Sequence, residues 1–131
     1  MGDVTRYNAA DCVITVDSVY ITGLGESMVE GEKDEDFFED STGAQGDVVV
    51  NEINDTKGTI TLSVQATCPQ RSMLIQYANA RKEFPFWAVN KALGSRMGGS
   101  KCRIMSMPPV KHGKTAEDLE IKIRAYDYTV E

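Results

Sequence analysis

The stretch that decides the fold is residues 46–81, GDVVVNEINDTKGTITLSVQATCPQRSMLIQYANAR. Its first part predicts two β-strands, residues 48–53 and 59–65, because both are rich in Val, Ile and Thr. The five residues between them, 54–58, include Asn, Asp and Gly, which turn easily. Apolar residues alternate with hydroxyl-bearing ones in the second strand. We therefore expect two strands joined by a tight turn, with one buried face.

A helix is predicted to follow at about residues 68–82. Pro69 suits the first helical turn, where its missing N–H costs no hydrogen bond. Apolar side chains then recur at spacings of three and four, at Met73, Leu74, Tyr77 and Ala78. This pattern is typical of a helix that lies across a sheet.

Outside this stretch, alternating apolar residues predict a strand pair at 11–22, a strand at 84–90, one at 101–107 and one at 119–125. The glycines in residues 91–100 predict a mobile loop. The whole indicates a mainly β fold, an antiparallel β-sandwich or small barrel of about six to eight strands with one flanking α-helix. We expect a single domain over residues 1–131, with a long acidic strand or loop extension at about 26–46.

Charge is distributed unevenly along the chain. The net charge is −6, but residues 26–40 hold eight acidic residues against Lys33. Residues 84–116 contain no acidic residue and six basic ones. The chain should therefore present two differently charged regions.

Residues 26–38 allow two interpretations. In a strand, Glu26, Glu30, Glu32, Asp34 and Asp36 share one parity and would project as a row from one face. Such a row must face water or opposite charge, because like charges repel. The alternative is a solvated acidic loop. The glycine and glutamate spacing of an EF-hand calcium loop is not present.

The sequence offers little for catalysis. A single histidine, His112, lies in a basic segment without a nucleophile motif, and no phosphate-binding loop is found. Three widely spaced cysteines form no metal-ligand pattern. We expect no enzyme activity, no metal and no cofactor. A basic aromatic stretch near Phe86 and Trp87 gives only a weak indication of single-stranded nucleic-acid binding.

The order of elements resembles a known family. A hairpin with Asp-Ser at its turn precedes an acidic strand and the glycine loop TGAQGD at 42–47. The segment NEINDTKG at 51–58 leads into TITL, and a Pro-led helix, an FPF strand, a strand ended by Pro108 and a final EIKI strand follow. This order resembles that of the tail tube proteins of contractile-tailed bacteriophages and phage-like particles. It is more distantly similar to that of the tube protein of type VI secretion systems.

The resemblance implies a structural virion protein that forms hexameric rings, whose sheets join into one inner barrel and which stack into the tail tube. Implied partners are further copies of the chain and the sheath, tape measure, baseplate and tail terminator proteins. Viral DNA would pass through without specific binding, and the tube would be assembled in the host cytoplasm. The acidic residues expected to face the lumen are Glu30, Glu32 and Asp34. Those expected at contacts between subunits are Asp36, Glu39 and Asp40, opposite Lys91, Arg96 and Lys101.

The alternative function is that of a monomeric β-barrel that binds a small ligand between sheet and helix. It requires an interior pocket with a few converging polar groups. The sequence shows no such set of residues.

Overall fold

The computed structural model describes residues 4–131, so the first three residues of the predicted domain lie outside the described part. The predicted class is confirmed, since the fold is mainly β with one α-helix packed on it. In chain order the elements are η1 (Ala9–Asp11), β1 (Cys12–Val16), β2 (Val19–Tyr20), β3 (Leu24–Lys33), β4 (Phe38–Thr42), β5 (Val48–Glu52), β6 (Gly58–Val64), α1 (Arg71–Ala80), β7 (Phe84–Asn90), β8 (Ser95–Ile104), β9 (Leu119–Ala125) and β10 (Thr129–Val130). Neither helix in this part of the chain has the length and apolarity needed to cross a membrane.

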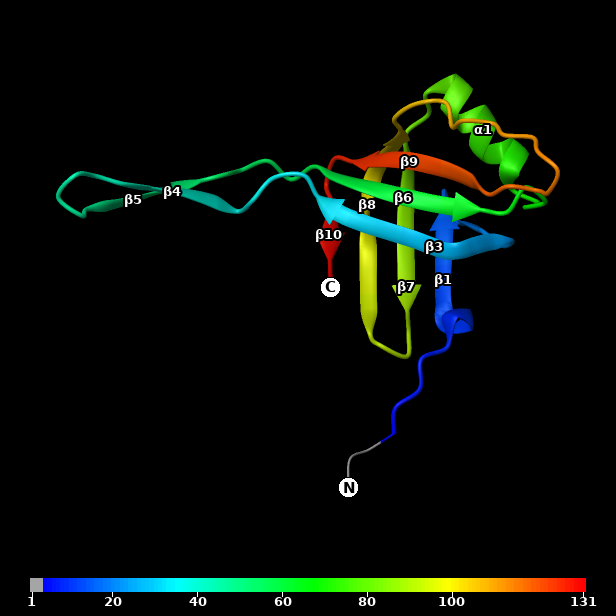
Figure 1. Ribbon diagram of the computed structural model, residues 1–131, viewed down its shortest axis with the longest axis horizontal. Coiled ribbons are helices and arrows are strands. Elements are labelled where there is room, and N and C mark those ends of the chain that lie inside the picture. The colour runs from blue at the N-terminus through cyan, green and yellow to red at the C-terminus, as the bar shows by residue number, and fades with distance from the viewer. Residues whose placement is uncertain (1–3) are drawn as a thin grey trace.

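Eight strands form one antiparallel sheet in the order β2-β1-β7-β8-β9-β6-β3, with β10 added beside β8. In Figure 1 the antiparallel strands β1, β7 and β8 stand upright, and β9, β6 and β3 cross over them. The sheet thus folds back on itself as a sandwich and is not closed into a barrel. Its two ends are β2, which has only two residues, and β3, which has ten.

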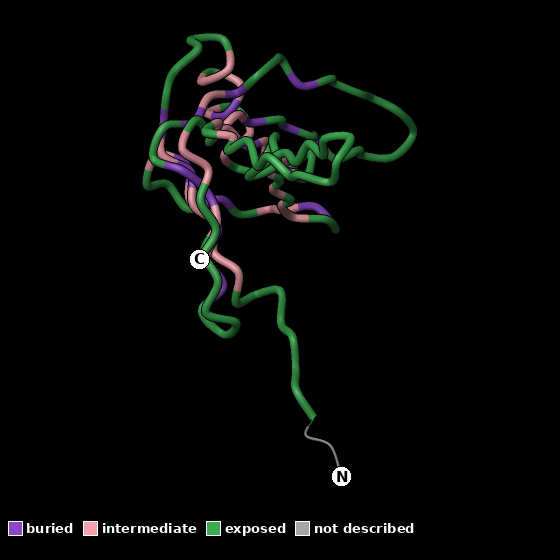
Figure 2. Tube along the Cα trace, turned by 90° about the vertical axis from the view of Figure 1, so that its left-hand side faces the viewer, coloured by how far each residue is buried: buried purple, intermediate pink, exposed green. Residues whose placement is uncertain are grey.

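The core lies between the two halves of this sheet. Along β6, β7 and β9 every second residue is buried, as the alternating sequence predicts. The largest fully buried side chains include Phe84, Phe86, Ile60 and Ile121. Helix α1 covers one end of the sandwich (Figure 1), and Leu74 is its one buried residue among those described. In Figure 2 the buried segments gather in the sheet.

Local sequence explains the sharp turn between β1 and β2. Asp17 and Ser18 both have positive φ, 52° and 66°. Two residues in this conformation form a tight hairpin whose twist matches that of the strands. Asp is one of the side chains that tolerates it.

The strand at Val48–Glu52 does not pair as the sequence predicts. We expected it to form a hairpin with the strand that begins near residue 59, but β5 pairs with β4 in a separate two-stranded sheet. This sheet, which we call the arm, projects away from the sandwich (Figure 1). β6 instead lies between β3 and β9. Residues 53–57 therefore connect the arm to the sandwich and do not form a tight turn between paired strands.

Two other predicted boundaries are wrong. Helix α1 begins at Arg71, later than predicted, because the residues around Pro69 form turns in which Cys68 N–H donates to Gln65 O and Arg71 N–H donates to Cys68 O. The loop predicted at residues 91–100 is only a short turn, since β8 already begins at Ser95. Gly98 and Gly99 lie inside that strand. A side chain at Gly98 would overlap Phe86 O, so the glycine permits close approach of β7 and β8.

Candidate functional site

The predicted acidic row begins on the exposed face of β3. Glu30 and Glu32 lie directly opposite Thr61 and Thr59 of β6, on the side of the sheet away from the core. Both glutamates are exposed. We call this side of β3, β6 and β9 the outer face.

The row is shorter than its parity predicts. The register of β3 against β6 shifts between Leu24 and Val29, which takes Glu26 out of line. β3 ends at Lys33, so Asp34 and Asp36 lie in the connection to the arm. The bulge and the strand end break an alternation that the sequence shows as continuous.

Asp34 is engaged within its own chain. Its Oδ2 lies 3.4 Å from Arg124 Nη2, and its Oδ1 accepts a hydrogen bond of 2.7 Å from Thr59 Oγ1. The Arg124 guanidinium thus offsets this negative charge. Arg124 Nε is buried and has no hydrogen-bond partner among the described residues.

Basic residues share the outer face with the glutamates. Lys122 and Arg124 of β9 lie opposite Thr61 and Thr59, one strand away from Glu30 and Glu32. Arg103 of β8 lies opposite Arg124 in turn. The outer face therefore has acidic residues on β3, while β9 and β8 carry three basic residues together with Glu120. Sequence reasoning did not predict that these acidic and basic residues share one face, because the two sets are far apart in the chain.

The edges of the sheet are open. β3 is a terminal strand and pairs only with β6 within residues 4–131. At the other end, β2 pairs with just Thr15 and Val16 of β1. Unpaired strand edges offer rows of N–H and C=O groups to another strand. The fold thus has two edges at which a second chain can add.

The arm carries apolar residues in the open. Every residue of β4 and β5 is exposed, and Val48, Val49 and Val50 are 58%, 58% and 53% exposed. Phe37 and Phe38 at its base are also exposed. A two-stranded hairpin is marginal in water by itself. The run of three valines was the available signal, but it predicted a strand with one buried face.

The acidic and basic residues predicted at subunit contacts do not meet within one chain. Glu39 and Asp40 lie on β4 of the arm, and Asp36 lies just before it. All three are exposed. Lys91 lies at the turn between β7 and β8, which is remote from the arm in Figure 1.

The other two basic candidates lie on β8 and are exposed. Arg96 stacks on Trp87, with its guanidinium carbon 3.8 Å from the ring centroid, and its Nη1 lies 3.8 Å from Glu131 Oε2. The backbone N–H of Lys101 donates to Asp127 Oδ1 at 3.1 Å. Within residues 4–131, Arg96 is thus the one of the three whose charged side chain forms an ion pair.

A cluster that sequence reasoning missed joins α1 to the β1–β2 turn. Tyr77 Oη donates to Asp17 Oδ2 at 3.0 Å, and Lys82 Nζ approaches the same oxygen at 2.9 Å. Hydrogen bonds from Lys82 and then Tyr77 lower the pKa of Asp17. The same carboxylate raises the pKa of Lys82 through their hydrogen bond. This cluster ties the helix to the sheet.

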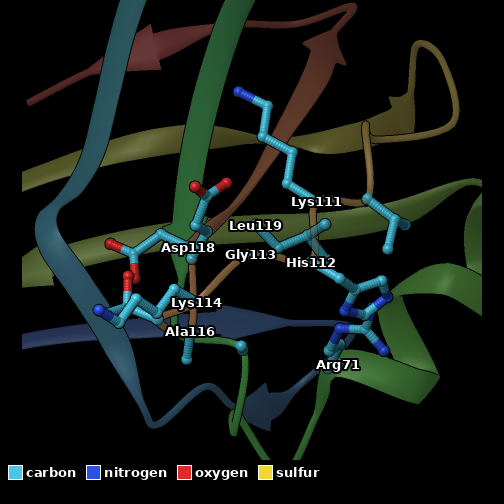
Figure 3. A pocket seen from close by; sticks show the side chains of 12 residues that line it. Arg71, Lys111, His112, Gly113, Lys114, Ala116, Asp118 and Leu119 are labelled. Carbon is cyan, nitrogen blue, oxygen red and sulfur yellow. The ribbon is translucent and has the colours of Figure 1, made fainter.

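The lone histidine lines a surface hollow of about 280 Å³ between α1 and the loop before β9. Figure 3 shows the side chains of Arg71 and His112 next to each other and Lys111 pointing away from them. His112 forms an isolated β-bridge with Ala116. Its surroundings in the hollow are thus largely the backbone and charged side chains of one exposed loop.

The cysteines are free thiols, with Cys68 and Cys102 buried and Cys12 half-buried. Burial raises the pKa of Cys102 to about 11. A thiol with such a pKa is protonated at neutral pH and is a poor nucleophile. Within residues 4–131, no group of three or more His, Cys, Asp or Glu side chains is arranged to hold a metal ion.

Comparison with known proteins was made for sequence and for structure. No family model matches the sequence, and no curated protein matches it either. Solved structures do match over nearly the full chain. A chain of the sheath–tube complex of PVC, an extracellular contractile injection system, has a TM-score of 0.66 at 16% identity, covering 96% of this chain and 91% of that one.

Two further matches are chains from the ends of such particles. One belongs to the PVC sheath/tube terminator, with a TM-score of 0.62, 14% identity and 99% of both chains covered. The other belongs to the tube-terminating cap of the anti-feeding prophage, with a TM-score of 0.61, 14% identity, and 100% of this chain and 94% of that chain covered. At these identities the likeness establishes a shared fold, the one found in these components of contractile injection systems.

Proposed function

We propose that this protein is a structural subunit of a contractile-tail particle, in which copies assemble into stacked rings that form the inner tube. The observation that carries the proposal is the shared fold over nearly the whole chain, at a TM-score of 0.66, with a chain of a sheath–tube complex. The two terminator matches favour the same class of particle. On this account the protein is not an enzyme.

The open sheet supports lateral assembly. A long, unpaired edge strand such as β3 is an aggregation hazard unless another chain covers it. Pairing of β3 with the opposite edge of the next copy would close the ring and cover both edges. A ring that is closed this way continues the sheet from subunit to subunit, as in a barrel. The runner-up function, a monomeric β-barrel that binds a small ligand, fits less well because the sheet is not closed and side chains fill its core.

The arm supports stacking. Its exposed valines need cover that one chain does not give them, and its carboxylates need a polar or basic surface. We propose that Asp36, Glu39 and Asp40 face basic residues of a neighbouring copy, chosen from Lys91, Arg96 and Lys101. Such charges mainly set the rate and register of docking. Reversing Glu39 and Asp40 should impair polymerisation in a light-scattering assay, and reversing the basic partner as well should restore it. If the combined variant is as defective as the first, this pairing is wrong.

We further propose that the outer face lines the lumen, with Glu30, Glu32 and Asp34 at the β3 side. The negative charges of Glu30 and Glu32 would repel the DNA phosphates, so that DNA passes without binding to the wall. Asp34 would hold Arg124, at 3.4 Å, back from the phosphates. Replacing Glu30 and Glu32 by Gln should slow DNA delivery without changing tube length. Unchanged delivery would indicate that these residues face elsewhere.

Electron microscopy of the purified protein at rising concentration tests the proposal. We expect rings of constant diameter that stack into tubes, because the edge contact closes and the stacking contact does not. Chains that remain single and dispersed at every concentration would contradict it.

A further inference from the structure

An apolar hollow lies between the base of the arm and the C-terminal strand. It has a volume of about 540 Å³, and we call it the C-terminal hollow; its lining residues are Lys33, Phe37, Thr56, Tyr128, Thr129, Val130 and Glu131. Phe37 and Val130 are 71% and 65% exposed. Large apolar side chains that gather around one exposed hollow are typical of an interaction site.

The walls of the hollow are held in place by contacts within the chain. Lys33 Nζ lies 5.1 Å from the centroid of the Phe37 ring and donates to Glu35 O at 2.7 Å. On the other side, Tyr128 N–H donates to Thr56 O at 3.1 Å. Arg96 and Glu131 exchange two backbone hydrogen bonds, of 3.0 and 2.8 Å, which fix β10 on β8. The hollow is therefore formed before any partner arrives.

Three carboxylates lie around the hollow, together with the ammonium group of Lys33. Glu35 and Asp36 line an adjoining hollow that shares Lys33 and Phe37 with the first. Glu131 adds a third carboxylate, which lies 3.8 Å from Arg96. A partner that fits this surface carries an apolar side chain next to a basic one.

The turn between β7 and β8, residues 91–94, has these properties. Leu93 is 65% exposed, and Lys91 beside it is exposed as well. Two hydrogen bonds close the turn. The buried Asn90 accepts one of 3.1 Å at its Oδ1 from Leu93 N–H, and Gly94 N–H donates the other to Lys91 O. Gly94 has a φ of 67°, a conformation that glycine adopts without strain.

We propose that residues 91–94 of one copy dock in the C-terminal hollow of the next copy, with Leu93 against Phe37 and Val130 and Lys91 facing Asp36. This inference rests on the proposed function and names a contact within that assembly. Figure 1 shows the turn below β10, on the same side of the molecule, and Glu131 bonds to Arg96 close to that turn. Because the two surfaces differ, one copy can insert its turn into the next copy while its own hollow receives the turn of the copy before. The proposed contact is this head-to-tail arrangement, which repeats from copy to copy as a ring or a stack requires, and not a reciprocal exchange between two copies.

Disulfide trapping tests the docking directly. In a Cys12→Ser background, which removes the half-buried thiol, one chain carries Leu93→Cys and another carries Val130→Cys. Mixing the two under mild oxidation should give a disulfide-linked dimer on a non-reducing gel. A chain with both substitutions should give a ladder of dimers, trimers and longer species. Val110→Cys, at a residue 51% exposed on a different loop, is the matched control and should not link to Leu93→Cys.

A second measurement concerns the strength of association. Leu93→Asp should weaken self-association in sedimentation velocity by about tenfold or more, because an apolar anchor is lost and a carboxylate is placed near the three carboxylates around the hollow. Val110→Asp should leave association unchanged, and circular dichroism should show that both variants keep the fold.

The outcomes separate this inference from the proposed function. Rings in the microscope with no Leu93–Val130 link would overturn the docking and leave the tube intact. A specific link without rings would support the docking and count against the tube. Neither rings nor link, or equal linking to the Val110→Cys control, would overturn the docking.

Discussion

The close contact between Gly58 and Tyr128 gives a quantitative prediction about the fold. Gly58 is the buried first residue of β6, paired with Lys33 on β3 and Ala125 on β9. A Cβ atom at this position would lie 2.6 Å from Tyr128 Cβ and 2.8 Å from its Cδ1. The Tyr128 ring has little room to withdraw, because its backbone N–H donates to Thr56 O. Gly58→Ala therefore forces either the strand or the ring to move.

The expected cost follows from two opposing effects. Overpacking of this kind destabilises by about 1–3 kcal/mol, and contact with the base of a side chain belongs at the upper end. Replacing glycine by alanine stiffens the unfolded chain and returns about 0.5–1 kcal/mol. The free energy of unfolding of Gly58→Ala should thus fall by about 2 kcal/mol.

A double-mutant cycle identifies the cause. Urea unfolding, followed by circular dichroism at concentrations below assembly, gives the free energy for Gly58→Ala, Tyr128→Gly and the double variant. The clash disappears when both the ring and the Cβ of residue 128 are removed, so the double variant should be little less stable than Tyr128→Gly alone. Gly43→Ala, in an open turn of the arm, is the control and should change stability by less than about 0.5 kcal/mol. Strict additivity, or a neutral Gly58→Ala, would refute this packing.

Three further predictions concern stability and reactivity. Leu74→Ala should lower the free energy of unfolding in urea by about 3–5 kcal/mol, because it removes the buried contact of α1 with the core; a loss below about 1 kcal/mol would mean that Leu74 does not anchor the helix. Hydrogen bonds lower the pKa of Asp17. Burial by itself would raise the pKa of Asp127, but the hydrogen bonds to its carboxylate outweigh burial, so the pKa of Asp127 is lowered as well. A carboxylate whose pKa is lowered in the folded state stabilises the fold at pH values above its ordinary pKa of 3.8, and this stabilisation is lost as the pH falls through the pKa of the folded state. The urea midpoint should therefore drop between pH 5 and pH 3. The drop should be smaller in the variant Asp17→Asn/Asp127→Asn. At pH 7.5 a thiol reagent should label Cys12 before Cys102, whose pKa is raised to about 11, and equal rates in the native protein would contradict the buried position of Cys102.

Much of the sandwich could be predicted from local sequence. Strict alternation located β6, β7 and β9, because in each case one face of the strand meets the core of the same chain. The Asp-Ser turn between β1 and β2 was predictable for a similar reason, since residues that tolerate positive φ are few. Where burial is completed within the chain, sequence pattern and structure agree.

The arm was mispredicted for the opposite reason. Three consecutive valines, Val48, Val49 and Val50, indicate a strand with one buried face, yet all three are more than half exposed in one chain. The glycines of β8 led to the wrong prediction of a mobile loop at residues 91–100. Gly98 lies inside the strand, where it permits close packing of β8 against β7. The charges on the outer face, such as Glu30 and Lys122, come together only through the pairing of β3, β6 and β9. Long-range pairing of this kind leaves no local signal in the sequence.

Hydrogen–deuterium exchange on dilute and concentrated protein tests most directly whether copies join at the free edge of β3. The account predicts that backbone amides in residues 24–33 become protected when the protein assembles, together with those of the arm at 38–52, while the already buried β9 changes little. Assembly that leaves exchange in β3 unchanged would contradict it.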